Sequence, residues 1–293
     1  MKFDFFTFGG RFVWEDVLNY QNWIIQRNIH TQKYRLLDNY NIRRDSGTFE
    51  NCKTTLLKYI EACEIKSPYT DSIILLHNYG RTKFSWNRIC ESLKKSNCNI
   101  IALNYMSLSQ TLKHNANLLA TLLRNLDNSG KLHFITHGAG CLILRQFLAL
   151  TDNYRIYNIA DVIDINPINS GSDLADLLCR SEILKKILGP MLSEITPQKA
   201  LDLPKLPKEI LHGIIFYPPV YTQLLKKLLR RYEGFPFLTP PSESSYAEKI
   251  CRINRNIFFP LNDSDLGEIC IQFITTENFP FTDLSTENSA DKK

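Results

Sequence analysis

The sequence contains no apolar run near the ~20 residues that a helix needs to span a bilayer. The stretch 1–10 is rich in phenylalanine, but Asp4 interrupts it and Gly9 and Gly10 close it, so we do not expect a signal peptide there. These two absences lead us to expect a cytoplasmic protein with no transmembrane segment.

The chain also lacks paired cysteines and a strong excess of one charge. Its 8 cysteines form no C-x-x-C pair, which argues against a zinc site or a disulfide framework, so we expect reduced, mostly buried thiols. Lys plus Arg is 35 and Asp plus Glu is 30, and the net charge of +5 is too small and scattered to predict nucleic-acid binding. A basic cluster at 226–231 is interpreted as a solvated helix face. We expect no metal ion and no cofactor.

The composition is that of a soluble globular chain, with 44% hydrophobic and 22% charged residues, and 293 residues suffice for one large α/β domain. Between residues 72 and 167, short apolar runs alternate with segments of helical periodicity. The predicted strands are 72–77, 99–104, 131–135 and 160–165, and the predicted helices are 84–94, 108–126 and 141–150. This alternation predicts a parallel sheet with helices on both faces.

The two flanking zones are less regular. Before residue 64 we expect short strands at 23–26, 34–37 and 47–49, then a helix at 53–62 that Asn51 caps. After residue 170 we expect a helix at 174–187, proline-bearing loops at Pro197, Pro204 and Pro207, a strand at 213–217, a helix at 221–232 and a last strand at 266–274. The predicted organisation is a β-rich lead-in with a helix at 1–64, an α/β domain at 65–281 and a disordered tail at 282–293.

The junction between the third strand and its helix reads THGAGC, residues 136–141. A strand that turns sharply into a helix is the setting of a nucleophile elbow, G-x-S-x-G, whose small flanking residues permit the tight bend. Here Thr136 and Gly140 are the flanks, and the centre is Gly138. Glycine has no nucleophilic atom, so an acyl-enzyme cannot form at this position.

The stretch 72–149 resembles bacterial lipase- and esterase-like α/β hydrolases. The matching segments are LLHNYGR (75–81), LNYMS (103–107) and FITHGAGCLILR (134–145), with weaker similarity in INPINSGS (165–172), FGGRFVWEDV (8–17) and SGTFENC (46–52). The similarity fades after about residue 217. It implies the α/β-hydrolase fold, with a mostly parallel central sheet flanked by helices and, here, a small β-rich N-terminal lead-in.

The resemblance also indicates which catalytic groups are missing. The family's acid has its nearest counterpart at Glu233, and the family's histidine base corresponds to the region near Asn262 and Asp263. No histidine follows His212 in this sequence, and His212 precedes a predicted strand, on the wrong side for the base. The order Ser, acid, His therefore fails at its first and last members.

The remaining candidates surround the elbow. The expected oxyanion and cleft region comprises His77, Asn78, Tyr79, His137 and Ala139. Asn78 stands where the family has glycine, and its side chain either narrows the approach to the cleft or belongs to an ordinary turn. A cysteine at position 141 is either a displaced thiol nucleophile or, as we favour, a small buried residue.

We therefore interpret the chain as a catalytically inactive, lipase- or esterase-like protein, a pseudoenzyme that retains the binding of a ligand or partner. The expected partners are an acyl or ester-like small molecule in the cleft, or an unidentified protein. The alternative is a weak or unconventional carboxylic-ester hydrolase. It would use Cys141, or a water activated by Glu233 or Asp263, because an oxyanion hole and binding alone can leave ~10³-fold catalysis.

Overall fold

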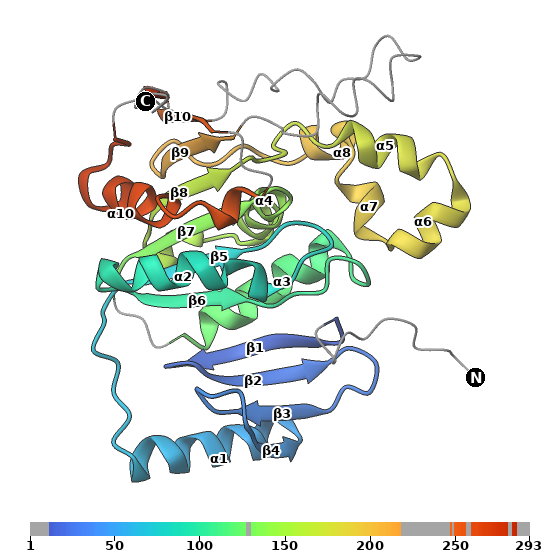
Figure 1. Ribbon diagram of the computed structural model, residues 1–293. Helices are drawn as coiled ribbons and strands as arrows, with labels where there is room; N and C mark the ends of the chain where they lie inside the picture. Colours follow the sequence, from blue (N-terminus) through green and yellow to red (C-terminus); the bar gives the residue numbers. More distant parts are fainter. Residues whose placement is uncertain are drawn as a thin grey trace, which may run out of the picture.

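The N-terminal part of the chain forms its own antiparallel sheet. The computed structural model describes residues 12–126, 130–217, 247, 249–255, 259–280 and 283–285. Four strands, β1 (Trp14–Tyr20), β2 (Trp23–Asn28), β3 (Tyr34–Leu37) and β4 (Arg43–Gly47), pair in chain order, and helix α1 (Phe49–Ala62) follows them. In Figure 1 this sheet lies below the rest of the molecule, with α1 at the bottom.

Two predictions for this region are wrong. A strand was expected at 47–49, but β4 ends at Gly47 and Phe49 already begins α1. The helix was expected to begin at Lys53 behind Asn51, whereas Thr48 is the cap: its side chain accepts a hydrogen bond from the Asn51 backbone N–H at 3.2 Å. The sequence of β4 is polar and has no alternating apolar pattern that would predict a strand. Backbone pairing with β3 holds this strand in the sheet.

A central sheet of seven strands forms the rest of the fold, in the order β11-β10-β9-β8-β7-β5-β6. Its strands are β5 (Ser72–Leu76), β6 (Asn99–Leu103), β7 (Leu132–His137), β8 (Ile159–Ile165), β9 (Leu211–Phe216), β10 (Lys249–Asn254) and β11 (Asp283–Ser285). Every neighbouring pair is parallel. All five residues of β5 are buried, as expected when helices cover both faces of a parallel sheet. The predicted fold class is confirmed.

Helices cover the two faces in separate groups. Helices α3 (Leu112–Arg124) and α4 (Gly140–Leu150) pack against one face, and α2 (Asn87–Leu93) and α10 (Leu266–Thr276) pack against the other. The shorter helices are η2 (Lys83–Trp86), η3 (Lys94–Ser96), η4 (Tyr154–Tyr157), α5 (Asp173–Cys179), α6 (Glu182–Leu188), α7 (Met191–Glu194), α8 (Pro197–Leu201) and η7 (Pro260–Asn262).

Several expected elements differ in type or extent. The last strand, predicted at 266–274, is helix α10, whose buried residues Leu266, Ile269, Cys270 and Phe273 repeat at helical spacing. Helix α3 begins four residues later than predicted, behind the cap Thr111. The helix expected at 174–187 breaks at Ser181, which caps α6. Pro197 opens helix α8 and does not lie in a loop, because proline suits the first turn of a helix. The helix predicted at 221–232 lies outside the described residues.

Buried carboxylates on β1 join the N-terminal sheet to the central one. Asp16 accepts hydrogen bonds from the Asn104 backbone N–H and from Lys83 Nζ, each at 3.0 Å. Its own backbone N–H donates to the Asn104 carbonyl oxygen at 3.0 Å. The neighbouring Glu15 contacts His114 Nε2 at 2.9 Å. Both carboxylates are almost fully buried, so these contacts fix β1 against the end of β6 and against α3.

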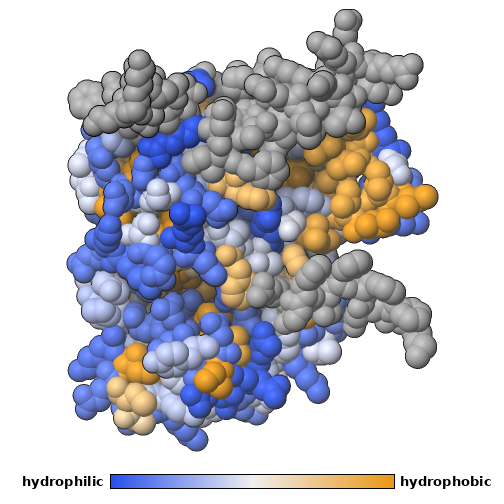
Figure 2. All heavy atoms as spheres, in the orientation of Figure 1, coloured by the Kyte–Doolittle hydropathy of each residue, from blue (hydrophilic) through white to orange (hydrophobic). Residues whose placement is uncertain are grey.

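The surface around α5 and α6 carries several exposed apolar side chains. Ile183 and Ile187 are each 71% exposed, and Leu174 is 44% exposed. Figure 2 shows a large hydrophobic area on this side of the molecule. Among the described residues, no helix is long and apolar enough to cross a membrane, and no group of three or more His, Cys, Asp or Glu side chains is arranged to hold a metal ion.

Candidate functional site

The chain turns from strand to helix within two residues at the predicted elbow. Strand β7 runs to His137, beyond its predicted end at residue 135, and α4 begins at Gly140. Gly138 has a φ of +53°, a conformation that favours glycine, and its backbone N–H donates to the Ile165 carbonyl oxygen at 3.1 Å. A Cβ on Gly140 would lie 2.5 Å from the Leu76 carbonyl oxygen, so the close approach of α4 to β5 requires glycine there. The turn has the geometry of a nucleophile elbow with no side chain at its centre.

The side chain of Asn78 fills the space above Gly138. A Cβ on residue 138 would lie 2.2 Å from Asn78 Oδ1 and 2.3 Å from Asn78 Cγ. Asn78 Oδ1 accepts two hydrogen bonds, one from the Ala139 backbone N–H at 2.9 Å and one from the Tyr79 backbone N–H at 2.8 Å. The carboxamide group therefore occupies the position that a side chain on residue 138 would need.

These two N–H groups are the donors that matter for ester chemistry on this fold. In α/β hydrolases the oxyanion hole combines the N–H of the residue after the nucleophile with an N–H from an earlier strand–helix loop. Ala139 follows the nucleophile position, and Tyr79 lies in the loop after β5. Both N–H groups already bond to one oxygen, Asn78 Oδ1, so an incoming carbonyl oxygen would have to displace it.

Aromatic packing and hydrogen bonds fix the loop that carries Asn78. The imidazole of His77 stacks on the ring of Tyr105, with ring centroids 3.7 Å apart and an interplanar angle of 8°. The Tyr105 hydroxyl donates to the His77 carbonyl oxygen, and His77 Nδ1 donates to the Asn78 carbonyl oxygen at 2.9 Å. Burial lowers the pKa of His77 to about 4, so the ring is neutral near pH 7. The Tyr79 hydroxyl donates to the Leu188 carbonyl oxygen and ties the loop to α6.

A cavity of about 260 Å³ opens beside the elbow. Its lining comes from the loop after β5, from η2, from the end of β7, and from η7 with the residue before it: Arg81, Ser85, His137, Phe259, Pro260, Leu261 and Asn262. Burial, followed by the nearby positive charge of Arg81, lowers the pKa of His137 to about 4. Asn262, one of the two residues at the family's base position, contributes a neutral amide to this cavity.

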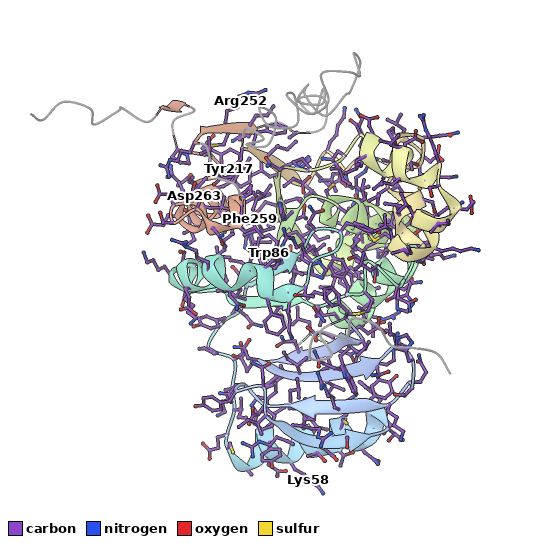
Figure 3. The ribbon with its side chains drawn as sticks, turned by 45° about the vertical axis from the view of Figure 1, so that its right-hand side comes forward. Lys58, Trp86, Tyr217, Arg252, Phe259 and Asp263 are labelled. Atoms are coloured by element: carbon purple, nitrogen blue, oxygen red, sulfur yellow. The ribbon has the colours of Figure 1, made fainter. Side chains whose placement is uncertain are left out.

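Asp263, the other residue at that position, is engaged elsewhere. The Tyr217 hydroxyl donates to Asp263 Oδ2 at 2.9 Å, and Arg255 Nη1 lies 3.1 Å from Asp263 Oδ1. The pair of Tyr217 and Asp263, and the nearby Phe259, can be followed in Figure 3. Burial, followed by the negative charge of Asp263, raises the pKa of the Tyr217 hydroxyl. The carboxylate is only 4% exposed and already has a cation and a hydroxyl as partners.

A buried polar network that was not predicted from the sequence pattern lies next to the elbow. Asp164 on β8 accepts from Thr136 Oγ1 at 2.6 Å and from Asn169 Nδ2 at 3.2 Å, and its Oδ2 lies 2.9 Å from His212 Nε2. His212 lies inside β9 and does not precede the strand, which corrects its predicted place. Asp164 therefore bridges the histidine ring and the threonine hydroxyl through its two carboxylate oxygens. The sequence feature that could have indicated this network is the charged Asp164 in the otherwise apolar run VIDI of β8.

The other sequence candidates are not brought to the cavity. Cys141 is 2% exposed and belongs to the hydrophobic core between the sheet and α4. Ser172 caps α5 and accepts a hydrogen bond from the Ala175 backbone N–H at 3.2 Å. Glu233 lies outside the described residues. The described part of the site thus joins His77, Asn78, Tyr79, His137 and Ala139 around Gly138.

Among solved structures, a Bacillus licheniformis lipase in its mature form is similar to this chain, with a TM-score of 0.52 and 14% sequence identity over 74% of this chain and 95% of the lipase. The propeptide form of that lipase gives a TM-score of 0.51 and 13% identity over 76% of this chain and 53% of the longer form. A Paleococcus ferrophilus monoacylglycerol lipase gives 0.47 and 12% identity over 73% and 95%. No family model matches the chain, and no curated protein matches its sequence. At these identities the comparisons show the fold alone, which is that of the α/β hydrolases.

Proposed function

We propose that this chain is a non-hydrolytic protein of the α/β-hydrolase fold, whose cleft beside the elbow binds a small molecule without cleaving it. The observation that carries the proposal is the position of Asn78. Its carboxamide oxygen accepts from both Ala139 N–H and Tyr79 N–H and lies where a side chain on residue 138 would begin.

Ester hydrolysis on this fold needs a nucleophile, a base and an oxyanion hole. Residue 138 supplies no nucleophilic atom. At the base position, Asn262 is an amide that takes up no proton near neutral pH, and Asp263 is bound to Tyr217 and Arg255. The oxyanion donors are already paired with Asn78. Each of these three positions therefore holds a non-catalytic group. A single substitution cannot restore all three.

The alternative, an unconventional hydrolase, lacks a matching geometry among the described residues. The Cys141 thiol lies in the core and does not line the cavity. Asp263 lacks the solvent exposure that activation of a water by its carboxylate requires, because it is 4% exposed. Both candidates remain testable by substitution.

The test is the hydrolysis of short p-nitrophenyl esters by the purified full chain and by the variants Cys141→Ala and Asp263→Asn. We expect all three proteins to release p-nitrophenol no faster than buffer containing an equal mass of the heat-denatured chain. Turnover by the unmodified chain above this reference would overturn the proposal, and its loss in one of the two variants would identify the group responsible. Circular dichroism spectra of the variants control for the loss of folding.

A further inference from the structure

The cavity beside the elbow has the character of an anion site, and this inference rests on the proposed function of that cleft. Its described lining contains one cation, Arg81, and no carboxylate. Arg81 forms no ion pair with the described residues. Asp263, which follows the cavity-lining residue Asn262 in the chain, makes its contacts with Tyr217 and Arg255. The cavity therefore offers a positive charge that the described protein does not neutralise.

Arg81 is held in place by an aromatic ring. Its guanidinium carbon lies 5.3 Å from the centroid of the Phe259 ring, within the range of a cation–π contact. A ring beneath the plane of a guanidinium leaves the N–H donors on the edge of the group available. Two parallel N–H donors match the two oxygens of a carboxylate, which makes arginine the usual partner of that group.

The rest of the lining divides into polar and apolar parts. Ser85 and Asn262 add neutral polar side chains, whereas Phe259, Pro260 and Leu261 add an apolar surface on η7 and the residue before it. His137 completes the wall, and the Nδ1 atom of its ring has no hydrogen-bond partner among the described residues. A ligand that suits this lining carries a negative head for Arg81 and a short aliphatic body for the apolar side.

We propose that this cavity binds a small aliphatic carboxylic acid, with its carboxylate on Arg81 and its alkyl chain against Phe259 and Leu261. The volume of about 260 Å³ lies just below the range of roughly 300–1,000 Å³ typical of drug-sized sites, so the acid is short and not a long-chain lipid. A free acid also needs no oxyanion hole, which suits a site in which Asn78 already bonds both donors.

The test is calorimetric titration of the full chain with hexanoate, hexanamide and inorganic phosphate at constant ionic strength. Hexanamide has the same alkyl chain without the charge, and phosphate has charge without the chain. The variants are Arg81→Gln and Arg81→Lys, and the matched control is Arg88→Gln, because Arg88 is also exposed but does not line the cavity.

We expect hexanoate to bind at least tenfold more tightly than hexanamide or phosphate. Arg81→Gln should weaken hexanoate binding at least tenfold, Arg81→Lys should retain part of it, and Arg88→Gln should leave it unchanged. No measurable binding of hexanoate, equal binding of hexanamide or phosphate, or an unchanged affinity in Arg81→Gln overturns the inference. These failures differ from failure of the proposed function, which shows as ester turnover in the separate assay above.

Discussion

A methyl group on residue 138 collides with Asn78, and the collision can be measured as a loss of stability. In Gly138→Ala the new Cβ lies 2.2 Å from Asn78 Oδ1, so the carboxamide must rotate away. The rotation breaks the hydrogen bonds to Ala139 N–H and Tyr79 N–H. At ~1 kcal/mol for each bond, this costs ~2 kcal/mol of the free energy of unfolding. Alanine at a φ of +53° adds ~1–2 kcal/mol of backbone strain.

The two contributions separate in a double-mutant cycle. Asn78→Ala removes the carboxamide, so in that background Gly138→Ala should cost only the backbone strain of ~1–2 kcal/mol. The two substitutions should therefore couple by ~2 kcal/mol in urea unfolding, since they act on the same contact. Gly80 is the matched control: its φ is +69°, but of the described atoms a Cβ there meets only Leu108 Cδ2, at 3.9 Å. Gly80→Ala should cost the strain alone and should add to Asn78→Ala without coupling.

Additive costs for Gly138→Ala and Asn78→Ala, within ~0.5 kcal/mol, would contradict the collision between the two side chains, because distant or independent sites behave in that way. The same result would mean that Asn78 does not occupy the space above the elbow. The explanation of why the oxyanion donors are unavailable would then be lost as well.

Three further perturbations test other parts of the structure. Lys83→Met leaves the buried Asp16 without the cation that it pairs with and should lower the free energy of unfolding by ~3 kcal/mol. Lys94→Met, in an exposed pair, should change the free energy of unfolding by less than ~1 kcal/mol. Equal effects of the two substitutions would contradict the buried contact between β1 and Lys83. Thr48→Ala removes the cap of α1 and should cost ~1 kcal/mol in urea unfolding, and no change would argue against that helix start. Burial lowers the pKa of His77 from 6.5 to about 4. Between these two pH values the imidazole of His77 is therefore protonated in the unfolded chain and neutral in the folded chain. The stability that the neutral ring gives should be complete above pH 6.5 and should fall by roughly 3 kcal/mol as the pH drops to about 4. The decrease in the free energy of unfolding with falling pH should be smaller in His77→Gln. An increase in the free energy of unfolding over the same pH range would contradict this prediction.

The central sheet could be predicted from the sequence because its strands are apolar on both sides. The runs at 72–77 and 99–104 end within one residue of β5 and β6. Strand β1 could not be predicted in this way, since it carries Glu15 and Asp16, whose burial depends on partners in β2, η2 and α3. The run at 266–274 was assigned to the wrong element because a short apolar segment fits a buried strand and a buried helix equally well.

The elbow could be predicted from small residues at fixed spacing, and the structure has a positive φ at Gly138. The position of the Asn78 side chain could not, because it depends on two backbone N–H groups that only the folded chain brings together. For the same reason the cavity could not be predicted from the sequence. Arg81 and Phe259 are far apart in the chain, and their contact exists only in the folded molecule.

The most direct test of the central claim is the intact mass of the full chain after incubation with a fluorophosphonate, a reagent that forms an adduct with activated serine hydroxyls. We expect an unchanged mass, because residue 138 has no side chain and the donors that would hold the phosphonate oxygen are bonded to Asn78. A stoichiometric adduct on one residue, lost after denaturation of the protein before labelling, would contradict the account and locate an active nucleophile.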